Sequence, residues 1–173
     1  MLGCVTAERE MRNLEPPDTH YLRAATGWLD LGNAAEAAAE LERIAPEMKA
    51  HPDVLDLRWN VCAREKDWET ALVLAELLVE EDPKRCSGWI HRSYSLHELK
   101  RTEEARAKLL PAVALFPKVG TIPYNLACYE CQLGFRDQAR RWLGVAARIS
   151  GKEEIHRLAL RDRDLEPLWP ELQ

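Results

Sequence analysis

The chain has 173 residues, of which 46% are hydrophobic and 31% charged, and its formal net charge is −5 at pH 7. This balance excludes an intrinsically disordered chain, and no apolar stretch approaches the roughly 20 residues that a membrane-spanning helix needs. Nucleic-acid binding requires a concentrated basic surface, which an acidic chain is poorly placed to offer. We therefore expect no membrane insertion and no nucleic-acid partner.

The cysteines indicate a reducing compartment. There are five of them, an odd number, and they are scattered through segments of helical pattern. Such an arrangement favours free thiols over a disulfide framework. The first residues also lack the apolar segment of a secretory signal. From both observations we expect a cytoplasmic protein.

A period of 34 residues is the strongest signal in the sequence. Ala37, Ala71, Ala105 and Ala139 follow one another at this interval, and each begins an apolar stripe of helical spacing. A fixed period of this size is typical of a helical repeat array. The sequence therefore predicts an all-α fold, an α-solenoid of about four helix–turn–helix repeats that form a right-handed superhelix.

Prolines and breaks in the helical pattern divide the chain into segments. Residues 1–17 carry no helical periodicity and end in two prolines, so we expect an irregular lead-in followed by one repeat domain, 18–173. Starts and breaks of the helical pattern place four units in this domain and a C-terminal cap after them: 18–51, 52–85, 86–119, 120–151 and 152–173.

The apolar spacing makes specific predictions within these units. In the first unit, Trp28 and Leu31 continue the buried stripe of the first helix. In the third, Thr102 is expected to cap a second helix that runs unbroken past Ala105 to Ala112.

The last segment is expected to close the array. A helix at 152–162 has no partner of its own, and the apolar residues Leu165, Leu168 and Trp169 follow it. Because the last repeat of an array would otherwise expose an apolar face, we expect this segment to fold back over that end.

The four units share a pattern of large, small and closing residues. It is given by Tyr21, Trp28, Gly32, Ala37 and Leu41; by Leu55, Ala71, Ala75, Leu78 and Pro83; by Trp89, Ala105, Leu109, Ala112 and Pro117; and by Leu126, Ala127, Gly134, Ala139, Leu143 and Ala146. This pattern resembles the tetratricopeptide repeat, a family of 34-residue helix–turn–helix units. One departure is Trp59, which stands where the family has a small residue and is expected to rotate or displace its helix. The ending LALRDRDLEPLW resembles the segment that follows such repeats in bacterial proteins, which suggests a bacterial source.

The resemblance implies a function. In this family the first helices line a concave groove that holds an extended peptide or a partner helix. We therefore expect a non-catalytic interaction module or scaffold whose partner is another protein, with a weak homodimer as a second association. Carried over by position, the groove residues are Asn60, Arg64, Tyr94, His97, Tyr124 and Cys128, preceded by Thr19, Leu22, Thr26 and Asp53.

Within this groove, Tyr94, His97 and Tyr124 are expected to form an uncharged patch with hydrogen-bonding tips. The alternative, that Tyr94 and Tyr124 only pack between helices, remains open. Some family members bind the C-terminal tail of chaperones through a clamp that includes two lysines. The corresponding positions here lack them, so a chaperone tail is not expected as the partner.

One motif offers an alternative function. Cys128 and Cys131 are three residues apart, so on a helix both thiols lie on one face and are able to share a metal ion. His97 and Cys62 are the nearest candidates for further zinc ligands. The pair lies in the middle of a helix, away from the helix N-terminus that activates redox cysteines. We interpret both as packing residues and expect no metal, no cofactor and no enzyme, with a thiol- or zinc-dependent protein as the alternative.

Overall fold

The computed structural model describes residues 13–172, so most of the predicted lead-in lies outside the described residues. From Asp18 onwards the described chain is helical and contains no strand. None of the helices in this described part has both the length and the apolar character that crossing a membrane requires.

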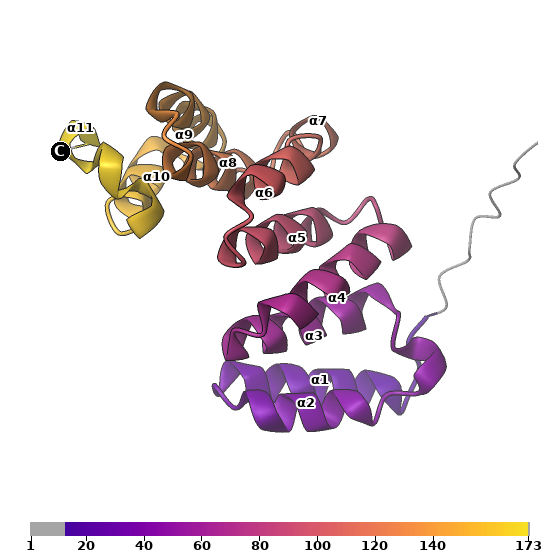
Figure 1. The fold of residues 1–173 in the computed structure, drawn as a ribbon. Helices are drawn as coiled ribbons and strands as arrows, with labels where there is room; N and C mark the ends of the chain where they lie inside the picture. The colour runs from indigo at the N-terminus through magenta and orange to yellow at the C-terminus, as the bar shows by residue number, and fades with distance from the viewer. Residues whose placement is uncertain (1–12, 173) are drawn as a thin grey trace, which may run out of the picture.

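The helices form four successive pairs that stack into a curved array (Figure 1). They are α1 (Asp18–Asp30) with α2 (Ala34–Glu42), α3 (Pro52–Glu65) with α4 (Trp68–Glu81), α5 (Cys86–Glu98) with α6 (Thr102–Leu109) and α7 (Ala112–Leu115), and α8 (Thr121–Gln132) with α9 (Arg136–Ser150). A 3₁₀ turn, η1 (Pro46–Met48), joins the first two pairs. The end is formed by α10 (Lys152–Ala159), η2 (Arg163–Leu168) and α11 (Trp169–Leu172). The predicted all-α solenoid with a C-terminal cap is confirmed.

The four periodic alanines lie at the points of closest packing. Ala37, Ala71, Ala105 and Ala139 are all 0% exposed, and each belongs to the second helix of its pair. Because a small buried side chain lets two helices pack closely, we interpret the period of the sequence as a period of helix contacts.

The turns inside the pairs repeat with the same period. Gly32, Lys66, Lys100 and Gly134 follow the first helices, and all four have a positive φ between 60° and 86°. This left-handed conformation ends a helix by satisfying its last carbonyls. Glycine adopts it without strain, whereas the side chain of a lysine makes it unfavourable.

Three local expectations are wrong. The second helix of the third pair is interrupted between α6 and α7, because Pro111 has no N–H to donate to the helix. Trp28 and Leu31 are exposed, at 38% and 78%, because α1 belongs to the first pair and no earlier pair among the described residues covers its outer side.

The third concerns the cap of α6. Thr102 is the first residue of this helix rather than its cap; the cap position is Arg101, which makes no side-chain capping bond. In the first two pairs the equivalent residues, Asn33 and Asp67, do cap through their side chains. Thr102 is instead bonded to His97, and its Oγ1 lies 3.0 Å from Nδ1 of that residue.

The alanine crossings give a first prediction. Ala105→Leu places a larger side chain where none fits and is expected to lower the free energy of unfolding by about 1–3 kcal/mol. Ala107→Leu is the matched control, since Ala107 lies on the same helix and is exposed. Urea denaturation measures both. Equal stability of the two variants would contradict the crossing role of Ala105.

The turns give a second prediction. Lys66→Gly is expected to raise the free energy of unfolding, by up to about 1 kcal/mol, since relief of the left-handed strain exceeds the extra entropy of glycine in the unfolded chain. Glu65→Gly, one residue earlier at the exposed last position of α3, is expected to lower it, by up to about 1 kcal/mol. Opposite signs in thermal and urea denaturation are the expected result. A destabilising Lys66→Gly would show that the lysine itself stabilises the turn.

Candidate functional site

The structure divides the six expected groove residues into two groups. Asn60 and Arg64 on α3 and Tyr94 on α5 are at least partly open to solvent. His97 on α5 and Cys128 on α8 are buried, at 7% and 4% exposure, and Tyr124 on α8 is half-buried. We call the first group the open half of the concave surface and the second group the closed half.

Tyr94 is the centre of the open half. Its ring is 38% exposed and meets two tryptophans edge to face, Trp59 at 6.3 Å and Trp68 at 5.6 Å between centroids. Burial of the hydroxyl, with the negative charge of Glu98 nearby, raises the pKa of Tyr94 to about 12. The side chain therefore stays neutral at physiological pH. It packs against the two tryptophans and is also exposed to solvent.

Trp59 supports this arrangement through its contacts with α5. Its indole lies flat on the ring of His91, with 3.6 Å between centroids, and its N–H donates to Ser95 Oγ over 2.9 Å. Ser95 has a small side chain and leaves room for the indole of Trp59. Trp59 itself stands at the position where the repeat pattern has a small residue. Trp59 thus forms a stacked contact between α3 and α5.

Charged groups tie the same two helices together. His91 Nε2 lies 2.8 Å from Asp56 Oδ1, and Arg85 donates to Asp53 over 2.6 Å. Burial acts to raise the pKa of Asp56, but the hydrogen bond and the charge of His91 outweigh it and lower that pKa below its ordinary value. The carboxylates of α3 are thus engaged with α5, which fixes the second pair against the third.

A separate groove of about 480 Å³ lies at the N-terminal end of the array. Among the residues that line it are Thr19, Leu22 and Thr26 of α1 and Asp53 of α3, all of which the sequence resemblance places in the groove. The lining mixes apolar and hydrogen-bonding side chains, as ligand grooves on proteins commonly do.

The closed half is covered by the chain's own C-terminal segment. Asp162 Oδ2 accepts hydrogen bonds from the Tyr124 hydroxyl over 2.9 Å and from the Cys128 thiol over 3.5 Å. Leu165 and Leu168, which follow, are fully buried in the apolar core of the last repeat. The expected return of the tail over this end is thus found, but it reaches further, onto the concave surface.

A second aspartate completes this contact. Asp164 Oδ2 lies 3.0 Å from His97 Nε2, and its backbone carbonyl accepts from Gln132 Nε2 over 2.8 Å. Because a carboxylate accepts only, the Nε2 atom of His97 carries the hydrogen. The expectation of an uncharged patch is therefore wrong in this half, since two carboxylates of the tail lie on His97 and Tyr124. Neither aspartate was among the candidate residues.

The surroundings of Cys128 suppress thiol chemistry. Burial, and then the carboxylates of Asp162 and Asp164, raise the pKa of this thiol well above its ordinary value. Because the thiolate is the reactive form, Cys128 is a poor nucleophile at neutral pH. Burial likewise raises the pKa of Cys131.

One group of possible metal ligands lies here. Cys128 Sγ and carboxylate oxygens of Asp162 and Asp164 lie within 4.8 Å of one another, the only such group of three among residues 13–172. A thiolate with carboxylates suits a divalent ion such as zinc. Cys131 and Cys62, which the sequence pairs with Cys128, are not members of this group, and its atoms already hydrogen-bond within the protein.

Comparison with known proteins identifies the fold through similar solved structures. No protein-family model matches the sequence, and no curated protein matches it significantly. Among solved structures, a thermophilic TPR protein of Thermus thermophilus superposes with a TM-score of 0.74 at 20% identity, over 90% of this chain and 82% of that one. The chain has the tetratricopeptide-repeat fold. MamA from Desulfovibrio magneticus RS-1 is also similar, with a TM-score of 0.71 at 15% identity, over 92% of this chain and 95% of that one.

Because the array buries tyrosine hydroxyls and a cysteine thiol, we expect it to lose stability at alkaline pH. Burial raises the pKa values of Tyr94, Tyr124, Tyr129 and Cys128, so the folded chain holds protons that the unfolded chain releases above about pH 9–10. The free energy of unfolding is therefore expected to be unaffected by these groups below that range and to fall as the pH rises through it. Urea denaturation at pH 7.5 and pH 10.5 measures the loss. Tyr124→Phe removes one of these protons, so its loss is expected to be smaller; an equal loss would contradict the assignment.

Proposed function

We propose that this protein is a non-catalytic interaction module that binds a peptide segment or a helix of another protein along the open half of its concave surface. The observation that carries the proposal is Tyr94, a ring held edge-on by Trp59 and Trp68 while more than a third of its surface faces solvent. A side chain that is fixed before binding loses little conformational entropy when a partner covers it. Aromatic residues in this position commonly supply much of the binding energy of an interface.

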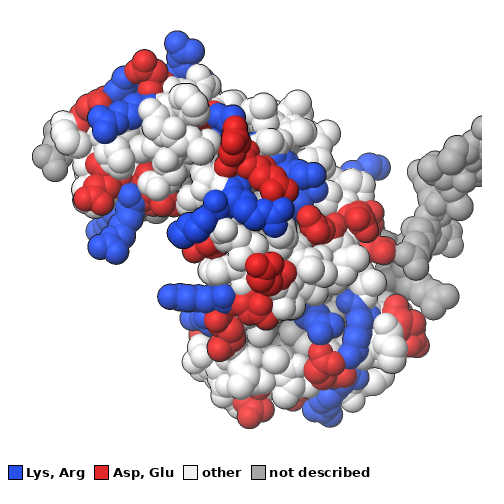
Figure 2. Space-filling model, in the orientation of Figure 1, with Lys and Arg blue, Asp and Glu red and all other residues white. Residues whose placement is uncertain are grey.

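The surroundings of Tyr94 indicate the kind of partner. Asn60 is half-buried, Arg64 is exposed, and the separate groove lined by Leu22 and Thr26 lies at the N-terminal end of the array. Such a surface favours an apolar anchor with a few polar contacts. Figure 2 shows Lys and Arg interspersed with Asp and Glu, without a broad basic area, on the face that it draws. This distribution supports a protein partner and does not favour nucleic acid. That the protein works in a bacterial cytoplasm remains a prediction from the sequence.

The zinc alternative is a second proposal, favoured by the group formed by Cys128, Asp162 and Asp164. It competes with a simpler interpretation, in which protons on the thiol and on Tyr124 satisfy the carboxylate of Asp162. Metal analysis of protein purified without chelator separates the two. One zinc per chain, lost in Asp162→Asn, would support the metal site.

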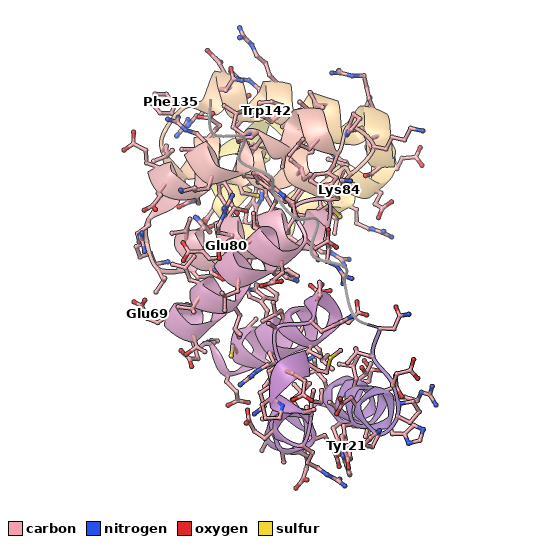
Figure 3. The ribbon with its side chains drawn as sticks, turned by 90° about the vertical axis from the view of Figure 1, so that its right-hand side faces the viewer. Tyr21, Glu69, Glu80, Lys84, Phe135 and Trp142 are labelled. Carbon is pink, nitrogen blue, oxygen red and sulfur yellow. The ribbon has the colours of Figure 1, made fainter. Side chains whose placement is uncertain are left out.

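The interaction module is tested by capture of the partner from an extract of the source organism, followed by titration of the captured protein. Tyr94→Ala is expected to weaken binding by about 1–2 kcal/mol, and Arg64→Ala to weaken it less. Phe135→Ala is the matched control, because Phe135 is 54% exposed and projects from one end of the molecule, opposite Tyr21 (Figure 3).

Because Tyr94 also packs on the tryptophans, circular dichroism at the binding temperature must show that the variant is folded. Binding that is unchanged in folded Tyr94→Ala, or lost equally in Phe135→Ala, would remove the open half as the site.

A further inference from the structure

The closed half of the concave surface is a polar site whose occupant is visible. Four side chains of the first helices α5 and α8 face the tail: His97, Tyr124, Cys128 and Gln132. They engage both side-chain carboxylates and one backbone carbonyl of the segment Asp162-Arg163-Asp164, so every polar contact from the groove to the tail ends on an acceptor oxygen. This is the contact pattern of a site that recognises an acidic segment, here the first turn of η2 and its cap Asp162.

The carboxylates have few other partners. Within the described chain, no lysine or arginine lies within 4.0 Å of a carboxylate oxygen of Asp162 or Asp164, and His97 is the one basic side chain at that distance. Arg163, between the two aspartates, is exposed. The side-chain hydrogen bonds of the two carboxylates therefore come from the groove, apart from the bond that Asp162 Oδ1 accepts from the Asp164 backbone.

The apolar part of the contact continues in the same direction. Leu165 follows the second aspartate directly and is fully buried, as is Leu168. Closing the last repeat requires apolar cover only, which these leucines supply. The paired aspartates are an additional feature, directed at side-chain tips of the surface on which this fold holds its ligands.

We propose that His97, Tyr124, Cys128 and Gln132 form a second binding site, for a segment of a partner protein with the chemistry Asp-x-Asp-Leu, and that the tail occupies this site in the free protein. The partner segment binds by displacing residues 162–165. Because the tail is attached to the same chain, its effective concentration at the site is high, and a free peptide competes only weakly with it. Tyr94 is not one of these four side chains, so different variants test this proposal and the function proposed above.

The test weakens the resident segment in the full-length chain and offers the same segment in solution. The variant is Asp162→Asn with Asp164→Asn, which retains both leucines. The probe is a fluorescein-labelled synthetic peptide LRDRDLEPLW, the sequence of residues 160–169, and the control peptide has asparagine at both aspartate positions. Fluorescence anisotropy gives the Kd, and alkylation of Cys128, followed by mass spectrometry, reports whether the tail has left the site.

The double variant is expected to bind the aspartate peptide at least ~10-fold more tightly than the wild-type chain does, and at least ~10-fold more tightly than it binds the asparagine peptide. The bound peptide should slow alkylation of Cys128. Adding Tyr124→Phe to the double variant should weaken the peptide severalfold, whereas Phe135→Ala should not.

Each other result overturns the proposal. Faster alkylation of Cys128 without peptide binding would show that the open site does not recognise aspartates. Alkylation as slow as in the wild type, again without binding, would show that the leucines alone hold the tail and that the polar contacts form no exchangeable site. Wild-type dimers that the double variant does not form, seen by light scattering, would assign the site to the tail of a second copy. In all these cases Tyr94-dependent capture is unaffected, so failure here does not count against the interaction module.

Discussion

The array depends on the close approach of two helices at one alanine per repeat. At each of these points the alanine is fully buried, and a small side chain there allows the two helices of a pair to pack closely. Repeating the same crossing in each pair stacks the pairs with a constant rotation, and the constant rotation curves the array. The first helices α1, α3, α5 and α8 form a row along this curved array, and the tail contacts the row at α5 and α8.

The two halves of this row differ because only one end of the array must be closed by the described chain. The last pair would expose Leu126, Leu143 and their neighbours without a cover, and α10 with η2 supplies it. The chain that provides this cover continues across the concave side, where its aspartates meet the donors of α5 and α8. The same segment therefore covers the last repeat and occupies the surface of α5 and α8 around His97 and Tyr124.

Sequence reasoning succeeded where a property repeats and failed where it occurs once. The alanine period is sufficient to derive the fold, since four equivalent positions reinforce one another. The left-handed turns have the same period, but two of the four are lysines, and a lysine gives no sign of positive φ in a sequence. Pro111 itself indicates the break between α6 and α7. The apolar spacing of Leu109 and Ala112 on either side of it, however, predicts one continuous helix. The aspartates of the tail could not be foreseen, because a contact between α5 and residue 164 is set by the path of the returning chain, and nothing in local spacing encodes that path.

Trp59 departs from the repeat pattern and packs together with residues of the next repeat. An average repeat would have a small residue in place of Trp59, and Tyr94 would then lack one of the two rings on which it leans. The tryptophan is accommodated because Ser95 and His91 of the next repeat accept it, the first through a hydrogen bond and the second by stacking. The departure from the pattern, its compensation and the exposed tyrosine thus form one packing unit between α3 and α5. This unit holds the ring of Tyr94 in place at the surface, and the interaction module proposed above rests on that feature.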